Sequence, residues 1–285
     1  MSSEICPVCL SELSAGYQSW HLFCKHCGYE KANLRPTINL HSAHQLIDEN
    51  AREIGLRDLR ISNFEKLLAG INSLKPTGGR LLDVGCAHGW FLEVAKSDFD
   101  VTGLEPDKNV FNSTVKLGLP VRMGYFPDAL SENEKFDVIV FNDVFEHIPD
   151  IDHILACCHQ RLNDGGLLVI NLPNSGGIFY RLSKIFCRFG LTSFFERLWQ
   201  KDLPSPHLHY FNLPNLIGLL KNKGFEVEIK GSLSTLRLSG LYTRVSYTGN
   251  HSLIARVIIY AITALSLPFL KILPSDIIYV VSKRN

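Results

Sequence analysis

The stretch Leu81-Leu82-Asp83-Val84-Gly85-Cys86-Ala87-His88-Gly89-Trp90 decides the fold class. Its apolar first half is typical of a buried strand, and the glycines after it form a tight turn that opens a helix. Glycines in such a turn let the backbone approach a ligand closely. The dinucleotide fingerprint G-x-G-x-x-G is absent, because Ala87 and Trp90 stand at its second and third glycine positions. Asp83, just before the turn, suits a cationic, amino-bearing ligand better than a pyrophosphate.

Strands and helices alternate along the chain from this turn. The apolar pattern predicts strands over 80–84, 100–104, 136–142, 166–172 and 225–230, and helices over 90–96, 108–117, 151–162 and 213–223. Near-continuous apolar strands between amphipathic helices indicate an open parallel sheet with both faces covered. Such sheets bind ligands at the carboxyl ends of their strands. The second strand ends at Glu105, where a carboxylate can accept hydrogen bonds from both ribose hydroxyls of an adenosine.

Together with Phe136-Asp137-Val138-Ile139-Val140-Phe141-Asn142-Asp143-Val144-Phe145-Glu146-His147-Ile148-Pro149-Asp150 and Leu162-Asn163-Asp164-Gly165-Gly166-Leu167-Leu168-Val169-Ile170, these residues resemble the class I S-adenosylmethionine-dependent methyltransferases. The resemblance covers about residues 76–172, and its motifs are specific jointly rather than singly. It implies an α/β fold with a Rossmann-like seven-stranded sheet whose last strand, over 276–282, is antiparallel. It also implies S-adenosyl-L-methionine as the methyl donor.

The resemblance implies a donor site built at the strand ends. The methionine end would be held by Asp83, Gly85, Cys86, Ala87 and Gly89. Glu105, followed by Pro106, would hold the ribose, and Tyr125 or Phe126 would stack near the adenine. Asn142 and Asp143 would line the methyl-donor pocket. Two alternatives stay open: Phe126 is a core residue, or Glu105 is a neighbour of a helix N-cap.

Three histidines are candidates for work on the methyl acceptor. His147 follows the fourth strand at the carboxyl edge, and its pKa range suits a general base that deprotonates a hydroxyl. His207 and His209 lie in the long connection over 173–212, which caps the substrate pocket in this fold, and they could bind the acceptor, act as a base or hold a metal. Structural packing or a contact with the cofactor is the alternative for His147. Neither an Asn/Asp-Pro-Pro-Tyr box nor a Pro-Cys nucleophile is present, which argues against a nucleic-acid substrate.

Four cysteines near the N-terminus have the spacing of a metal site. Cys6-Pro-Val-Cys9 and Cys24-Lys-His-Cys27 are two Cys-x-x-Cys knuckles, whose four thiolates suit tetrahedral zinc. We therefore predict a zinc ribbon over 1–35 with a structural Zn²⁺, since four thiolates close the coordination shell. A redox pair or unrelated cysteines are the alternatives. Residues 36–75 are predicted to be helical, and 76–285 to form the methyltransferase domain.

Composition and charge limit the remaining possibilities. The 285 residues are 46% hydrophobic and 20% charged with a net charge of +1, which excludes a mainly disordered chain and gives no global sign of nucleic-acid binding. Residues 76–172 hold 7 basic and 15 acidic side chains, whereas 173–285 hold 14 and 5. No secretory signal is apparent, so we expect a cytoplasmic location with reduced cysteines.

The last third of the chain is basic and apolar. Residues 178–201 combine aromatic and basic side chains, and 253–270 contain Arg256 as their single charge, within an apolar insert over 231–275. Both segments could lie on an anionic membrane surface, or pack on the domain as ordinary cover helices. A single membrane crossing is disfavoured, because the last strand must return to the sheet.

The sequence therefore predicts a methyltransferase that O-methylates a glycan, a lipid-linked sugar or another small membrane-associated acceptor. The whole-chain arrangement looks like that of bacterial methyltransferases of cell-envelope glycan or lipid biosynthesis. Two rivals remain: a ribosomal or transfer RNA methyltransferase whose ribbon grips RNA, and a non-catalytic scaffold at the membrane.

Overall fold

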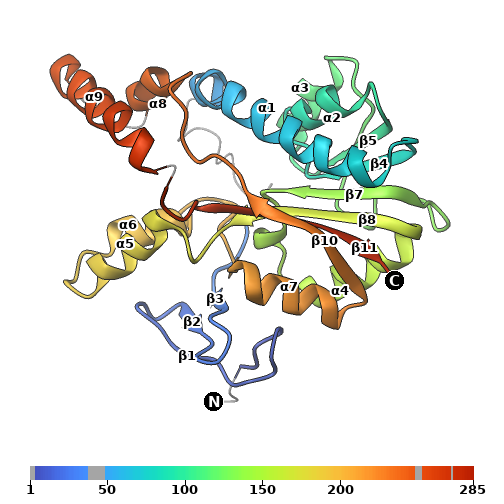
Figure 1. The fold of residues 1–285 in the computed structure, drawn as a ribbon, viewed down its shortest axis with the longest axis horizontal. Coiled ribbons are helices and arrows are strands. Elements are labelled where there is room, and N and C mark those ends of the chain that lie inside the picture. The colour runs from blue at the N-terminus through green and yellow to red at the C-terminus, as the bar shows by residue number, and fades with distance from the viewer. Residues whose placement is uncertain (1–3, 38–48, 248–251, 271) are drawn as a thin grey trace.

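A computed structural model describes residues 4–37, 49–247, 252–270 and 272–285, which form a large sheet with helices on both faces and a small N-terminal sheet (Figure 1). The strands of the large sheet are β4 (Arg80–Val84), β5 (Asp100–Glu105), β6 (Val121–Met123), β7 (Phe136–Asn142), β8 (Leu162–Pro173), β10 (Phe225–Ser232) and β11 (Ile277–Arg284). The helices that cover it are α1 (Glu49–Leu74), α2 (Trp90–Ala95), α3 (Lys108–Val115), α4 (Ile151–Arg161) and α7 (Leu213–Asn222).

The large sheet has the strand order β10-β11-β8-β7-β4-β5-β6. Only β11 runs antiparallel to its two neighbours, while the other adjacent strands pair in parallel. This confirms the predicted class I methyltransferase fold with its antiparallel last strand. The helix predicted over 36–75 was too long: α1 begins at Glu49 among the described residues, residues 36 and 37 are not helical, and 38–48 lie outside the described part of the chain.

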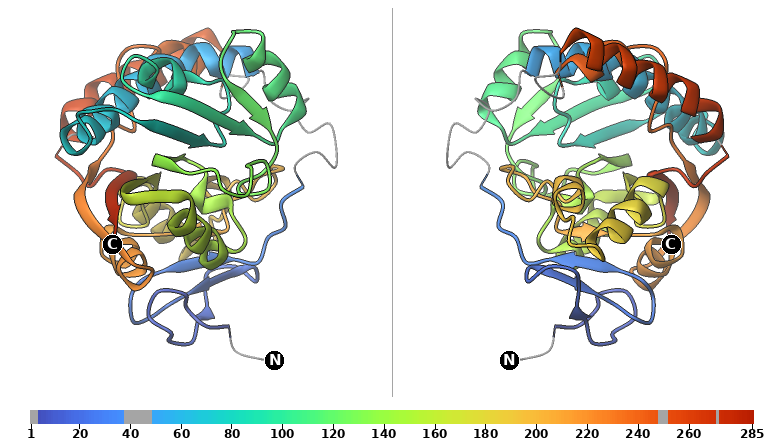
Figure 2. Two further views of the ribbon diagram at one scale, coloured as in Figure 1. Left: turned by 90° about the vertical axis from the view of Figure 1, so that its right-hand side faces the viewer. Right: turned by 90° about the vertical axis from the view of Figure 1, so that its left-hand side faces the viewer.

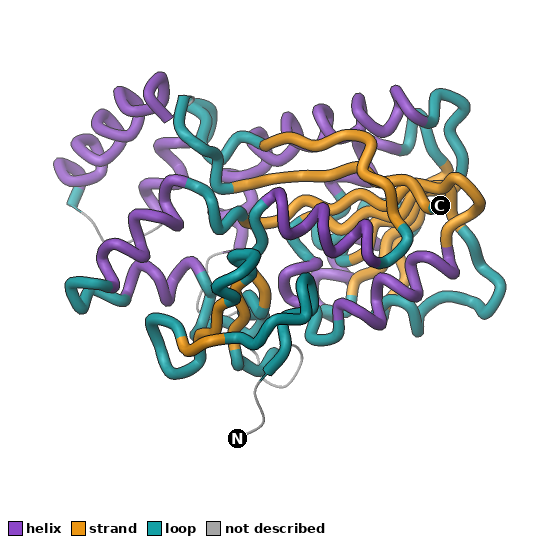
Figure 3. The backbone as a smooth tube through the Cα atoms, turned by 60° about the horizontal axis from the view of Figure 1, so that its bottom comes forward, coloured by secondary structure: helices purple, strands orange, loops and turns teal. Residues whose placement is uncertain are grey.

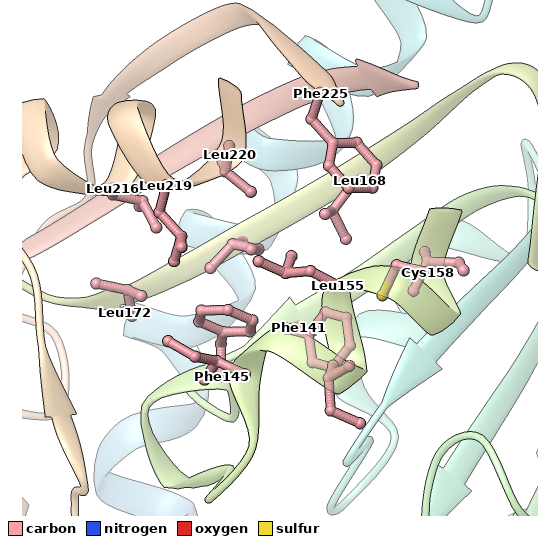
Figure 4. Packing of buried hydrophobic residues seen from close by; sticks show 14 of the residues in the cluster. Phe141, Phe145, Leu155, Cys158, Leu168, Leu172, Leu216, Leu219, Leu220 and Phe225 are labelled. Atoms are coloured by element: carbon pink, nitrogen blue, oxygen red, sulfur yellow. The ribbon is translucent and has the colours of Figure 1, made fainter. Parts of the chain in front are cut away.

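The core has two halves because side chains alternate between the faces of each strand. Phe141, Leu168 and Leu172 point to the face covered by α4 and α7, where they pack with Phe145, Leu155 and Leu219 (Figure 4). Val140 and Val169, one residue away on the same strands, belong to the other half, under α1 and α2. Burial on both faces explains why these strands are nearly continuous apolar runs.

The N-terminal sheet is completed by a strand from the distant connection over 173–212. Its order is β1 (Ser14–Ala15), β2 (His21–Phe23), β3 (Glu30–Ala32) and β9 (His209–Tyr210). Strands β3 and β9 pair antiparallel, with Glu30 opposite Tyr210. In Figure 3 these strands form a group separate from the large sheet, and Figure 2 shows the N-terminal segment at one end of the molecule. Backbone hydrogen bonds therefore join the predicted ribbon to the connection over 173–212, which we term the cap.

A buried carboxylate joins the ribbon to the cap helices α5 (Ile178–Cys187) and α6 (Ser193–Leu198). Glu30, 4% exposed, accepts hydrogen bonds from His21 Nε2 at 2.9 Å, from the Tyr180 hydroxyl at 2.7 Å and from Lys184 Nζ at 2.7 Å. Burial by itself would raise the pKa of Glu30, but the hydrogen bond from His21 and the charge of Lys184 hold that pKa below its ordinary value. Aromatic rings surround the group: Trp20, Tyr180, Phe195, Trp199 and Tyr210.

The insert between β10 and β11 contains two helices, α8 (Leu241–Tyr247) and α9 (Leu253–Leu270). Helix α8 packs on α1, and α9 packs on α8. In the described part of the chain, α9 meets the length and hydropathy requirements of a membrane-crossing helix, although those two properties alone are weak evidence for a crossing.

We predict that Glu30→Ala lowers the free energy of unfolding by about 3 kcal/mol, because it leaves the half-buried Lys184 and the buried His21 and Tyr180 without their partner. Thermal and urea unfolding measure the change, with Glu132→Ala, at an exposed glutamate, as the control.

Because the pKa of Glu30 is lowered, the stabilisation that Glu30 provides is present above the ordinary value of 4.5 and is lost as pH falls through the lowered pKa. The gap between wild type and Glu30→Gln should therefore narrow on acidification, and a pH-independent gap would contradict this account.

Candidate active site

The turn between β4 and α2 has the tight geometry that the glycines predict. Gly85 and Gly89 lie at φ 69° and φ 72°, in the left-handed region. A Cβ on Gly85 would lie 2.7 Å from Val144 Cγ2, and one on Gly89 would lie 2.4 Å from Leu119 Cδ1. The side chain of Cys86 is buried in the core, so this residue can face a ligand only through its backbone. The turn is thus packed too closely for side chains at its two glycines.

Glu105 lies at the carboxyl end of β5, beside this turn. Its Oε2 accepts from the Ala87 N–H at 2.9 Å and its Oε1 from the Asp107 N–H at 2.8 Å. The N-cap of α3 is Asp107, which accepts from the Asn109 and Val110 N–H groups, so Glu105 is a neighbour of a helix N-cap, as one of the two alternatives held. Two backbone donors hold the carboxylate in place at the carboxyl end of the strand. Pro106 continues the chain directly after it.

A chain of side-chain hydrogen bonds crosses three neighbouring strands. Asn171 on β8 donates to Asn142 Oδ1 at 2.6 Å, and Asn142 on β7 donates to Asp83 Oδ1 at 3.1 Å. Burial first, and also the charge of Glu105, raise the pKa of Asp83 to about 8, against the hydrogen bond from Asn142. Asp83 is therefore protonated at neutral pH until a cation approaches it.

The two aromatic candidates for the adenine site differ in exposure. Tyr125 is 53% exposed, whereas Phe126 is 8% exposed and packs edge-on against Phe141 at 5.9 Å between ring centroids. The core alternative for Phe126 is thus the one that the structure favours, and Tyr125 is the ring available to a ligand.

A cavity of about 220 Å³ adjoins the end of β7. Its wall includes Arg60 of α1, Asp143, Asn171 and Leu233, the last from the start of the insert. Arg60 Nη1 donates to Asp143 Oδ2 at 2.5 Å, and Asp143 is held at φ 53°. Sequence reasoning missed Arg60, which carries no motif, and Asn171, whose polarity in an apolar strand was a usable signal. This cavity is the candidate acceptor site.

Glu146, His147 and His207 form a polar cluster beyond the end of β7. Glu146 and His147 lie on the 3-10 turn η2 (Phe145–His147), and His207 comes from the cap. The Oε1 of Glu146 is 3.9 Å from Nε2 of each histidine, and the two rings are 4.7 Å apart. Neither carboxylate oxygen has a hydrogen-bond partner among the described residues. Burial, and then the charge of Asp143, raise the pKa of Glu146 well above its ordinary value.

This cluster can hold either a proton or a cation. One ligand atom from each residue lies within 4.8 Å of the others, and a carboxylate with two imidazoles fits a divalent transition metal. His147 Nδ1 lies 2.9 Å from the Pro206 carbonyl, which can only accept, so Nδ1 carries the proton. In the neutral ring, Nε2 then holds the free lone pair. The sequence pattern indicated His147 and His207, whereas Glu146, which directly precedes His147, was missed as a site residue.

His209 lies apart from this cluster. Its Nδ1 bonds to the Tyr29 hydroxyl of the ribbon, and its Nε2 donates to the Ile148 carbonyl at 2.8 Å. Burial lowers the pKa of His209 to about 4. The expected pair of His207 and His209 is therefore not a metal pair, and we propose no catalytic role for His209, because both its nitrogens are in use.

The four N-terminal cysteines come together as their spacing predicts. Cys6, Cys9, Cys24 and Cys27 place their sulfur atoms within 4.8 Å of one another. The separations are 3.5 Å from Cys6 to Cys27 and 3.4 Å from Cys9 to Cys24, far beyond a disulfide bond. Four sulfurs at these distances fit a tetrahedral zinc ion, whose bonds to sulfur are about 2.3 Å long.

Comparison with known proteins agrees with this geometry. Residues 56–229 match the family described as "Methyltransferase domain". Ubiquinone biosynthesis O-methyltransferase of Rattus norvegicus is 28% identical over 194 residues, which cover 61% of this chain and 56% of that protein. The protein of the same name from Pasteurella multocida is 31% identical over 137 residues, covering 42% and 54%. The chain thus spans about half the length of the curated relatives it matches.

Solved structures show the same fold at low identity. A possible histamine N-methyltransferase of Thermotoga maritima has a TM-score of 0.57 at 14% identity, covering 86% of this chain and all of that one. Phosphoethanolamine N-methyltransferase 2 of Haemonchus contortus, in complex with S-adenosyl-L-methionine, has a TM-score of 0.51 at 19% identity, covering 76% and 51%. At these identities the likeness concerns the fold alone.

We predict that Glu105→Ala weakens the binding of S-adenosylhomocysteine by roughly a hundredfold. The substitution removes the carboxylate that is expected to accept hydrogen bonds from the two ribose hydroxyls of the ligand. Isothermal titration calorimetry measures the change, with Glu132→Ala as the control and a thermal melt as the check of folding. Equal affinity in wild type and Glu105→Ala would show that the ribose lies elsewhere.

Asp83 gives a second prediction, on pH. With a pKa of about 8 it is mostly protonated at pH 7, and the ammonium group of a bound ligand favours the ionised form. Binding of S-adenosylhomocysteine at pH 7 should therefore release about one proton, and the affinity should rise with pH until it levels off near pH 8. Calorimetry in two buffers of different ionisation enthalpy counts the protons. Asp83→Asn should release fewer, and an unchanged count would assign the proton to another group.

Proposed function

The chain belongs to the methyltransferase-domain family, and from this premise we propose that it transfers the methyl group of S-adenosyl-L-methionine to a hydroxyl oxygen of a small, membrane-associated acceptor. The observation that carries the proposal is the edge where β4, β5 and β7 end. There Asp83, the glycine turn and Glu105 form a donor site, and the cavity beside Asp143 adjoins it. A donor site next to a cavity is what a two-substrate transfer needs.

The bound donor supplies a methyl group on a positively charged sulfur. Asp83 is placed for the amino group of the donor and Glu105 for its ribose, so the reactive carbon is directed along the strand ends. His147 Nε2 holds a free lone pair and takes the proton of the acceptor hydroxyl as the oxygen forms its bond to the methyl carbon. The carbon–sulfur bond breaks, and S-adenosylhomocysteine leaves neutral. The enzyme mainly positions the donor and the acceptor and excludes water from the site.

Oxygen is the proposed target because the curated relatives are named O-methyltransferases. Two acceptor classes follow from different observations. The apolar insert beside the cavity favours a glycan or lipid-linked sugar presented at a membrane. The names of the relatives favour an acceptor of ubiquinone biosynthesis. O-methylation of either class needs a hydroxyl presented to the donor and a base that takes its proton.

We also propose that the four cysteines bind Zn²⁺ with a structural role. Four thiolates leave no open coordination position for a substrate. The ribbon they close shares β9 with the cap, so the ion stabilises the position of the cap rather than the chemistry. Nucleic acid is not part of this proposal, because Trp20 and Tyr29 of the ribbon are buried rather than displayed.

The acceptor is tested with methyl-labelled donor, purified protein, and two acceptor pools: lipid-linked glycans and prenylated phenols. Label should enter one pool as an acid-stable ether, and Glu105→Ala should abolish it. Label in RNA, or in neither pool while donor binding is intact, would refute the proposal.

For the base, we predict that His147→Ala lowers kcat about a hundredfold or more while the affinity for S-adenosylhomocysteine stays within twofold. His153→Gln, at an exposed histidine of α4, is the matched control. A loss of donor affinity equal to the loss of rate would mean that His147 supports the donor site instead.

A further inference from the structure

Helix α9 presents an apolar face to solvent. Its mean hydropathy is 2.0, and only 6% of its residues are buried. Ile254, Ile258, Ile262, Leu265 and Phe269 are between 52% and 74% exposed and follow one another at intervals of three or four residues. They therefore form one stripe along the helix. A cover helix of a soluble domain has the opposite pattern, with its apolar stripe against the core.

A second apolar site lies at the same end of the molecule. In the turn between α5 and α6, Phe189 is 76% exposed and Leu191 is 64% exposed. Figure 1 shows α9 and the α5–α6 pair at one end, and the right-hand view of Figure 2, which faces that end, shows both helical regions on it. Together, the stripe on α9 and this turn form what we term the apolar end.

Exposed basic side chains lie on the cap helices that this turn joins. Arg181, Arg188 and Arg197 of the cap are exposed, and no ion pair joins any of them to the other described residues. Residues 173–285 carry 14 basic and 5 acidic side chains. Exposed apolar and aromatic side chains beside unpaired arginines match the interface of a bilayer, with its acyl chains below and anionic headgroups above.

From these observations we propose that the apolar end binds the surface of an anionic phospholipid membrane, with α9 lying in the plane of the interface. The inference goes beyond the proposed methyl transfer and does not depend on the acceptor.

The connections of α9 argue for an in-plane helix rather than a span. Its 18 residues are roughly 27 Å long, close to the hydrocarbon thickness of about 30 Å. At its start, five residues lie between Leu253 and the end of α8, and helix α8 packs on α1. At its end, six residues lie between Leu270 and the start of β11 at Ile277. Fully extended, such connections reach at most about 25 Å, too short to return across the bilayer.

The surface of the domain holds α9 in this position. Tyr242 of α8 packs edge-on against Tyr260 of α9 at 5.8 Å between ring centroids, and Leu267 is buried. The insert that leads to these helices also supplies Leu233 and Thr235 to the cavity beside Asp143. A membrane bound at the apolar end would therefore lie along the same insert that walls the acceptor cavity.

The test is co-sedimentation of the full chain with extruded vesicles of phosphatidylcholine, with or without 30% phosphatidylglycerol. We expect binding to the anionic vesicles that weakens with salt. Ile258→Asp/Ile262→Asp should weaken it on the order of tenfold or more. The matched control is Val115→Asp/Leu117→Asp, at exposed apolar positions on and after α3, which should bind as wild type does. Thermal melts and S-adenosylhomocysteine titrations establish that each variant folds.

Arg188→Glu/Arg197→Glu should reduce binding to anionic vesicles and leave the weak binding to neutral vesicles unchanged. Three results would overturn the proposal: no binding by folded wild type, equal loss in the α3 control, or protein retained in the vesicles after alkaline carbonate, which would indicate a span. Light scattering tests the alternative that a second copy of the chain covers the stripe on α9. If wild type is an oligomer that does not bind vesicles, and the α9 variant is a monomer, this face is an interface between copies. Vesicle binding is measured without methyl transfer, so failure of either proposal is distinguishable from failure of the other.

Discussion

The parallel register of β4 with its two neighbours brings the chemistry of this protein to one edge of the sheet. Val84 lies beside Leu104 on one side and Phe141 on the other. The residues that follow each of these three therefore emerge together: Gly85, Glu105 and Asn142. A shift of this register would turn the apolar side chains of a strand to the opposite face and separate these three residues. The geometry of the proposed donor site is thus a consequence of the hydrophobic packing of the strands.

The acceptor side depends on a different part of the chain. Strand β9 ties the cap to the ribbon, and Glu30 anchors the helix α5 through Tyr180 and Lys184. Next to and within β9, the Leu208 N–H donates to the Glu146 carbonyl at 2.8 Å, and His209 Nε2 donates to the Ile148 carbonyl. These bonds fix the short turn that carries His147. The ribbon is therefore connected to the candidate base through a continuous series of hydrogen bonds, which gives the proposed zinc site a structural role at a distance from the proposed chemistry.

What the sequence could predict follows from the range of each interaction. The glycine turn, the strand ends and the two cysteine knuckles are local patterns, and the structure has the turn, the strands and the cysteine cluster where they were expected. Arg60 and Glu146 were missed because their significance comes from contacts made by distant segments. Glu146 becomes buried only when the cap brings His207, 61 residues later, against it. For the same reason the sequence left acceptor binding, base catalysis and metal binding open for His209, because its partner Tyr29 lies 180 residues away.

The uneven distribution of charge also gains a physical interpretation from the fold. The acidic middle of the chain includes Asp83 and Glu105, which lie where the proposed donor would carry its positive charges. The basic last third forms the cap and the insert, where the proposed surface is anionic. If the two charge types were mixed on one face, each would weaken the attraction of the other for its ligand within a Debye length of about 8 Å. Placing α9 on an insert between β10 and β11 keeps them apart, because those strands lie at the far edge of the sheet from β5 and β6. The same sheet therefore separates the site for a charged donor from the proposed membrane face, and the acceptor cavity lies between them, walled by α1, the ends of β7 and β8, and the start of the insert.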